Sequence, residues 1–152
     1  MAQPRERIRV GVVPHTHWDR EWYAPFQQFR ARLVRTLDGL LDLLEADPGF
    51  GRFMLDGQTA LIDDYLAVRP GNEARLRALI AEGRVSIGPW TTLPDEFMVS
   101  GETLVRNLQM GVARAESLGG CTHLGYLPDM FGHIAQMPQL LHRAGFTDAV
   151  VW

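Results

Sequence analysis

The chain has 152 residues and a net charge of −3, with 46% hydrophobic and 22% charged residues, a composition that fits one globular core and argues against disorder. Its 15 basic residues are all arginines and are scattered, which argues against nucleic-acid binding. No stretch approaches the roughly 20 apolar residues of a membrane span, no signal-peptide segment is present, and the single cysteine, Cys121, excludes an intrachain disulfide. We therefore expect a cytoplasmic protein without a membrane or nucleic-acid partner; homo-oligomerisation is left open.

Strand and helix patterns alternate along the whole chain. Apolar β-branched runs predict buried strands, and apolar residues recurring every 3.6 positions predict amphipathic helices. In chain order, the predicted strands lie at 8–13, 52–55, 85–88, 124–127 and 148–152, and the predicted helices at 26–44, 59–68, 72–83, 100–118 and 134–144.

Capping and breaking residues mark the ends of these helices. The tripeptide 47–49, Asp-Pro-Gly, ends the first helix, Asn72 is expected to cap the third and Gly83 to end it, and Ser100 is expected to cap the fourth. The connections are long enough for parallel βαβ units, so the sheet should be parallel. In such sheets ligands bind beyond the carboxyl ends of the strands, where this chain places polar and aromatic residues.

The first of these clusters follows the predicted strand at 8–13. If the chain stays extended there, His15, His17 and Asp19 point to one side. Imidazole nitrogen and carboxylate oxygen are ligands that zinc prefers. We interpret His17 and Asp19 as half of a metal site and His15 as a ligand or a residue that supports one. Trp18 and Trp22 flank them and could form an aromatic wall for a sugar ring.

A second carboxylate, Asp129, follows the predicted strand at 124–127 and should point into the same mouth. Each group also has a purely structural alternative. The histidines could be polar residues at a strand end that bond nearby backbone, and Asp129 could be an N-cap or a turn-forming aspartate.

Four ordered motifs together resemble a known family. They are H-T-H-W-D-R-E-W-Y at 15–23, D-G-Q-T at 56–59, G-P-W at 88–90 and Y-L-P-D-M-F-G-H at 126–133. The pattern, from about residue 8 to the last residue, resembles the N-terminal catalytic domain of glycoside hydrolase family 38, the retaining α-mannosidases, and is similar to its bacterial mannosylglycerate hydrolase branch.

The resemblance implies a seven-stranded parallel β/α barrel, of which residues 1–152 would form a truncated N-terminal portion with about five strands. It implies a divalent metal ion, commonly zinc, and α-mannoside substrates. His17 and Asp19 become metal ligands, and Asp129 becomes both a ligand and the catalytic nucleophile. His15 is not a ligand in the family, which assigns it a supporting role.

Further residues near the predicted strand ends are candidates for the site or its rim. Trp90 is either a sugar-stacking wall or a core residue, His133 belongs to the fourth motif, and Asp95 and Glu96 are expected at the rim. The family's fourth ligand, a histidine, and its general acid, an aspartate, lie downstream of position 152. This chain alone is therefore expected to be inactive.

Two alternatives to a glycosidase remain at this point. A metal-dependent amidohydrolase or deacetylase also carries H-x-H after its first barrel strand, although the absence of lysine removes one common bridging ligand from this segment. A non-catalytic remnant is the other alternative.

Overall fold

The computed structural model describes residues 8–152 and has five short strands and five α-helices within that range. The strands are β1 (His15–Thr16), β2 (Phe53–Leu55), β3 (Val85–Ser86), β4 (Gly125–Leu127) and β5 (Ala149–Val151). The helices are α1 (Phe26–Ala46), α2 (Ala60–Leu66), α3 (Glu73–Ala81), α4 (Gly101–Leu118) and α5 (Met137–Arg143), with a 3-10 turn, η1 (Pro70–Asn72), before α3.

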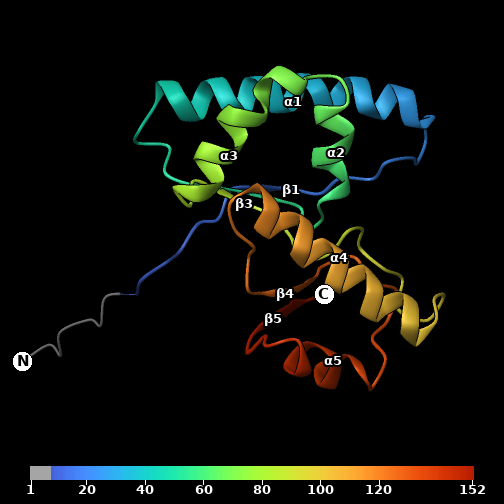
Figure 1. Cartoon of the computed structure of the whole chain (residues 1–152). Helices are drawn as coiled ribbons and strands as arrows, with labels where there is room; N and C mark the ends of the chain where they lie inside the picture. Colours follow the sequence, from blue (N-terminus) through green and yellow to red (C-terminus); the bar gives the residue numbers. More distant parts are fainter. Residues whose placement is uncertain (1–7) are drawn as a thin grey trace, which may run out of the picture.

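The strands form two separate parallel sheets (Figure 1). One has the order β1-β2-β3 and the other pairs β4 with β5. The prediction of a parallel α/β fold is therefore confirmed. Within the described residues the strands do not close into a barrel, since no ladder joins the two sheets; one isolated bridge, between Gln58 and Trp90, extends the first sheet past its strand ends.

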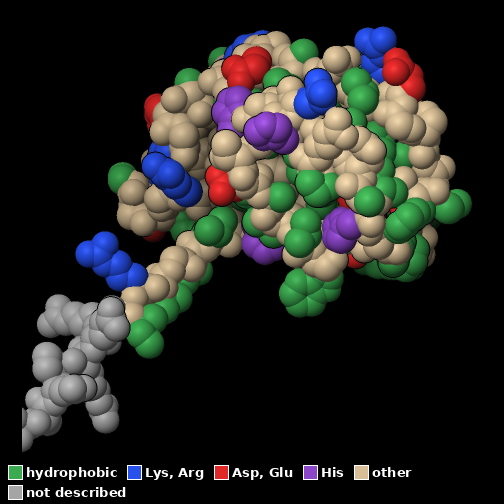
Figure 2. Space-filling model, turned by 90° about the horizontal axis from the view of Figure 1, so that it is seen from below, with side chains coloured by type: hydrophobic (Ala, Val, Ile, Leu, Met, Phe, Trp, Pro, Cys, Tyr) green, Lys and Arg blue, Asp and Glu red, His purple; other side chains and the backbone are tan. Residues whose placement is uncertain are grey.

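The predicted buried strand at 8–13 is wrong. These residues form no strand, and Val10 and Val12 are 79% and 84% exposed. The segment runs away from the body of the protein (Figures 1 and 2). Its composition favours a strand, but a strand also needs a partner, and in the N-terminal segment the ladder with β2 includes only His15 and Thr16.

Two clusters of buried side chains make up the core. The larger one lies among α1, α2, α3 and the first sheet, and the smaller one lies between α4, α5 and the end of β4. Helix α4 belongs to both, because Leu104 and Leu108 enter the smaller cluster while Ala115 and Leu118 enter the larger one. This helix therefore joins the two halves of the molecule. No helix in residues 8–152 is both long and apolar enough to cross a membrane.

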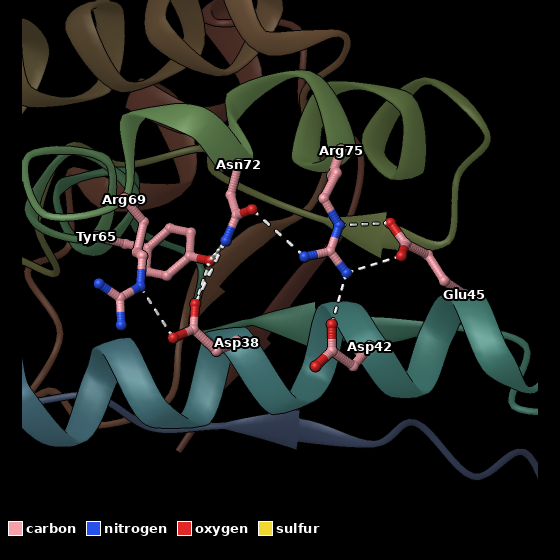
Figure 3. A network of polar contacts seen from close by, with 7 residues as sticks. All are labelled: Asp38, Asp42, Glu45, Tyr65, Arg69, Asn72 and Arg75. Atoms are coloured by element: carbon pink, nitrogen blue, oxygen red, sulfur yellow. Dashed lines mark hydrogen bonds and ion pairs between the residues drawn. The ribbon is translucent and has the colours of Figure 1, made fainter.

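Polar side chains also attach α2, η1 and α3 to α1 (Figure 3). The Tyr65 hydroxyl donates to Asp38 Oδ1 over 2.8 Å, and Arg75 bonds both Asp42 and Glu45. Burial raises the pKa of Tyr65 to about 12, so its hydroxyl stays a donor at neutral pH. Asn72 occupies the N-cap position of α3, as predicted, but its side chain forms no capping bond and donates to the Tyr65 hydroxyl instead. The prediction that Ser100 caps α4 is confirmed, because its hydroxyl accepts from Thr103 N.

Gly111 allows α4 to lie directly on the backbone that follows β3. A Cβ atom at this position would lie 2.2 Å from Pro89 O, whereas a Cβ at Gly39 on α1 would meet nothing within 4 Å. Both glycines are inside helices. The same substitution should therefore have opposite effects at the two positions.

We predict that Gly111→Ala destabilises the protein by about 1–3 kcal/mol, because the new methyl group overpacks against rigid backbone. Gly39→Ala should stabilise it by about 0.5–1 kcal/mol, because alanine favours the helix and nothing obstructs it. Urea unfolding of both variants and the wild type measures the difference. Equal effects at the two positions would contradict the close approach of α4 to residues 89–90.

Candidate metal centre

His17, Asp19 and Asp129 come together beyond the carboxyl ends of β1 and β4. His17 Nε2 lies 3.4 Å from Asp19 Oδ1 and 3.3 Å from Asp129 Oδ2. One ligand atom from each of the three residues lies within 4.8 Å of the others. Their side chains are 39%, 45% and 57% exposed. The structure thus brings together three groups from two distant segments of the chain.

This donor set fits a divalent ion such as zinc. Ligand atoms 2.0–2.2 Å from a tetrahedral zinc lie roughly 3.3–3.6 Å apart, and two of the separations here fall in that range. One imidazole and two carboxylates are also ligand types that zinc accepts. The partial exposure of all three leaves room for a further ligand or a substrate oxygen.

Asp56, at the end of β2, lies beneath this cluster and is fully buried. Its Oδ1 is 3.2 Å from His17 Nδ1, and its Oδ2 accepts hydrogen bonds from Trp18 N and from Gln58 Nε2. Asp56 belongs to the D-G-Q-T motif, but the sequence alone predicts no role for it. Its position in the sequence could have indicated a role, because the first residue after a buried parallel strand lies at the edge of the sheet where ligands bind.

Three carboxylates act on the single imidazole. Burial alone would lower the pKa of His17, but Asp56, Asp19 and Asp129 together raise it above its ordinary value. Burial raises the pKa of Asp56, an effect that the hydrogen bonds from Trp18, Gln58 and His17 partly offset. The centre therefore attracts positive charge, whether a proton or a cation.

A cavity of about 270 Å³ opens beside the cluster. It is lined by polar and apolar groups in similar proportion, among them Asp19, Arg20, Asp95, Asp129 and Phe131. Arg20 is held there by Asp64 through two bonds of 2.7 and 2.9 Å. Asp64 is itself buried and serves as the anchor of Arg20.

The tryptophans differ in placement. Trp18 lines the cavity and packs edge-on against Phe29, and Trp22 is 76% exposed. Trp90 is 1% exposed and its Nε1 donates to Tyr126 O, so it has no free face for a sugar and belongs to the core. His15 does not join the cluster, because its Nδ1 lies 3.4 Å from the Tyr126 hydroxyl instead.

Asp95 lies at the cavity, but Glu96 is buried and is not a rim residue. Glu96 accepts from Ile134 N and is bonded to His133 Nδ1, both over 2.8 Å. His133 therefore ties the loop after β4 to the loop after β3, and it is not part of the cluster formed by His17, Asp19 and Asp129. The hydrogen bond to Glu96, which outweighs burial, raises the pKa of His133 above its ordinary value.

Fold and site together define an α/β protein with a candidate metal centre at the carboxyl ends of its strands. Residues 7–152 match the family model described as the glycosyl hydrolases family 38 N-terminal domain. The chain belongs to glycoside hydrolase family 38.

Individual relatives agree with this assignment. A provisionally named mannosylglycerate hydrolase from Halalkalibacterium halodurans is 47% identical over 140 residues, which are 91% of this chain and 16% of that protein. Mouse alpha-mannosidase 2x is 30% identical over 150 residues, 96% of this chain and 13% of that protein. The crystal structure of an alpha-mannosidase from Enterococcus faecalis superposes with a TM-score of 0.89 at 42% identity, covering 91% of this chain and 16% of the other.

The pair of Glu96 and His133 generates a pH-dependent prediction. Because the folded pKa of His133 is raised, its ion pair stabilises the protein below the ordinary histidine pKa, near 6.5, and this stabilisation is lost as pH rises through the folded value. His133→Gln should cost on the order of 1 kcal/mol at pH 6 and less at pH 9. Thermal unfolding of variant and wild type across this range tests it.

His142→Gln provides the control. His142 is exposed at the end of α5 and, within residues 8–152, forms no ion pair with a carboxylate. Its substitution should change the unfolding temperature by a similar small amount at both pH values. A constant difference for His133→Gln would show that the pair with Glu96 is not formed in solution.

Proposed function

We propose that this chain forms the nucleophile-bearing N-terminal portion of a metal-dependent retaining α-mannosidase. The observation that carries the proposal is the meeting of His17, Asp19 and Asp129 at one cavity in a family 38 chain. Family membership favours glycoside over amide cleavage, which disfavours the amidohydrolase alternative. The relatives named as mannosidases support an α-mannoside as the substrate class.

In this proposal Asp129 is the nucleophile. One carboxylate oxygen attacks the anomeric carbon as the glycosidic C–O bond breaks, a covalent glycosyl-enzyme forms, and water later releases the sugar with net retention. Asp129 is 57% exposed at the cavity, which gives a substrate access to it. A bound divalent cation, which we propose to be zinc, would keep the carboxylate ionised and help to hold the sugar hydroxyls.

His17 and Asp19 would hold the cation together with Asp129, while Trp18 and Asp95, which line the cavity, would contact the sugar. Trp22 is exposed and does not line this cavity. Because the chain spans 16% of its bacterial relative, we further propose that it completes a β/α barrel only with additional segments that supply a general acid and a fourth ligand. The chain alone should then be inactive. Burial raises the pKa of the Cys121 thiol to about 11, so Cys121 is not a nucleophile at neutral pH. The cytoplasmic location and homo-oligomerisation of the protein remain predictions.

A chimera tests the nucleophile directly. In it this chain replaces the matching residues of the Enterococcus faecalis alpha-mannosidase, which it resembles at 42% identity. Asp129→Asn should lower kcat on an aryl α-mannoside by on the order of 10³-fold or more, because an amide cannot form the glycosyl intermediate. Asp63→Asn, an exposed carboxylate on α2, is the control and should retain the activity of the unchanged chimera. An Asp129→Asn chimera with full activity would refute the proposal.

Removal of the metal ion supplies a second prediction. Prolonged dialysis of the active chimera against a chelator should abolish aryl α-mannoside hydrolysis, and added Zn²⁺ should restore it, because His17, Asp19 and Asp129 need a cation to bind the sugar hydroxyls. Steady-state kinetics before and after readdition measure the effect. Hydrolysis that survives verified metal loss would contradict metal dependence.

A further inference from the structure

We propose that Asp56 is a positioning residue that fixes the tautomer and ring orientation of His17 so that Nε2 presents its lone pair to a cation. The inference rests on the proposed metal site but goes beyond it, because it assigns a role to a residue outside the cluster. Its basis is the contact pattern of one buried carboxylate with three nitrogen atoms, from His17, Trp18 and Gln58.

The two ring nitrogens of His17 face different partners. Nδ1 lies 3.2 Å from Asp56 Oδ1, and Nε2 lies 3.3 and 3.4 Å from Asp129 and Asp19. An ionised carboxylate only accepts hydrogen bonds, so the proton of a neutral imidazole must be on Nδ1 to satisfy Asp56. The lone pair of Nε2 then points at the two other carboxylates, where a cation would be bound. Histidine ligands of metals commonly have such an outer partner.

The sheet itself brings Asp56 to this position. In the parallel ladder His15 pairs with Met54 and Thr16 with Leu55. Continuing the same register by one residue places Asp56 opposite His17, and paired residues of neighbouring strands point their side chains to the same face. At Asp56 the backbone leaves the strand with a φ of 21°. The carboxylate therefore lies where the strand pair ends.

The second carboxylate oxygen of Asp56 is fixed as well. Trp18 N donates to Oδ2 over 2.5 Å and Gln58 Nε2 over 2.8 Å. Gln58 Nε2 also donates to Trp18 O over 2.7 Å. With Oδ2 held by two donors, the carboxylate cannot rotate, and Oδ1 remains aimed at His17.

Asparagine at position 56 would present a hydrogen-bond donor instead of an acceptor to His17 Nδ1, with almost no change in the shape of the side chain. Its amide oxygen would take the place of Oδ2, because Trp18 N and Gln58 Nε2 both donate there. The amide NH₂ would then face His17 Nδ1, which would have to accept. That arrangement moves the imidazole proton to Nε2 and turns the metal-facing nitrogen from an acceptor into a donor.

The experiment is calorimetric titration of the 152-residue chain with Zn²⁺. Asp56→Asn should lower the affinity by about 10–100-fold. Asp64→Asn is the matched control, because Asp64 is also a buried aspartate that anchors the same loop, through Arg20, without touching His17. It should change the affinity by less than about threefold. An unchanged affinity in Asp56→Asn, or an equal loss in both variants, would overturn the inference.

A measurement on the wild-type chain guards against an Asp56→Asn variant that does not fold. Long-range ¹⁵N–¹H NMR spectra of the zinc-loaded chain should show His17 protonated on Nδ1, with a downfield proton resonance; protonation on Nε2 would overturn the inference. Failure of the proposed function is distinct, since it would appear as absent mannoside hydrolysis by the chimera while zinc binding and its dependence on Asp56 persist.

Discussion

The buried carboxylate of Asp56 joins the ends of two neighbouring strands, and the rest of the site depends on this junction. A carboxylate without solvent contact is costly unless both oxygens are bonded, and here a ring nitrogen, a backbone N–H and a side-chain amide surround it. Two of these donors belong to the loop after β1. The loop therefore has one favourable position, with His17 directed at the cavity and the following residues at its edge.

The distance between the two halves of the metal cluster depends on how the two sheets meet. Asp129 follows β4, and within the described residues no backbone ladder joins β4 to the sheet of β1, β2 and β3. Trp90, after β3, donates from Nε1 to Tyr126 O on β4, and a Cβ at Gly57 would lie 2.3 Å from the Tyr126 ring. Since Gly57 follows Asp56 directly, the same turn that supports His17 also sets the approach of β4. Helix α4, which packs in both core clusters, supports this contact from outside.

Local patterns in the sequence predicted the helices, because helix formation depends on residues close together in the chain. The periodicity from Phe26 to Leu44 and the serine cap of α4 are examples. The length of the connections between strands predicted that the strands run parallel. The residues at 8–13 show the limit, because a strand also requires a distant partner that composition does not reveal. Glu96 and Asn72 show the same limit. Glu96 bonds His133 and Asn72 bonds Tyr65, and the local sequence around neither residue identifies its partner.

The site itself was partly predictable, and the missing part was the support beneath it. His17, Asp19 and Asp129 were found from residue type, position after strands and family resemblance. Asp56 is part of the D-G-Q-T motif, but its proposed role follows from a register that only the paired strands define.

The balance of charge at the cluster argues for a cation as its natural occupant. Three carboxylates, Asp19, Asp56 and Asp129, lie within 3.4 Å of one imidazole. Arg20 lines the same cavity, but both of its bonds go to Asp64. A purely structural polar cluster would be expected to pair its positive and negative charges with each other, as Arg75 of α3 does with Asp42 and Glu45 of α1. The unbalanced negative charge at the cavity instead matches a divalent ion, which would leave the exposed side of Asp129 available to a bound substrate.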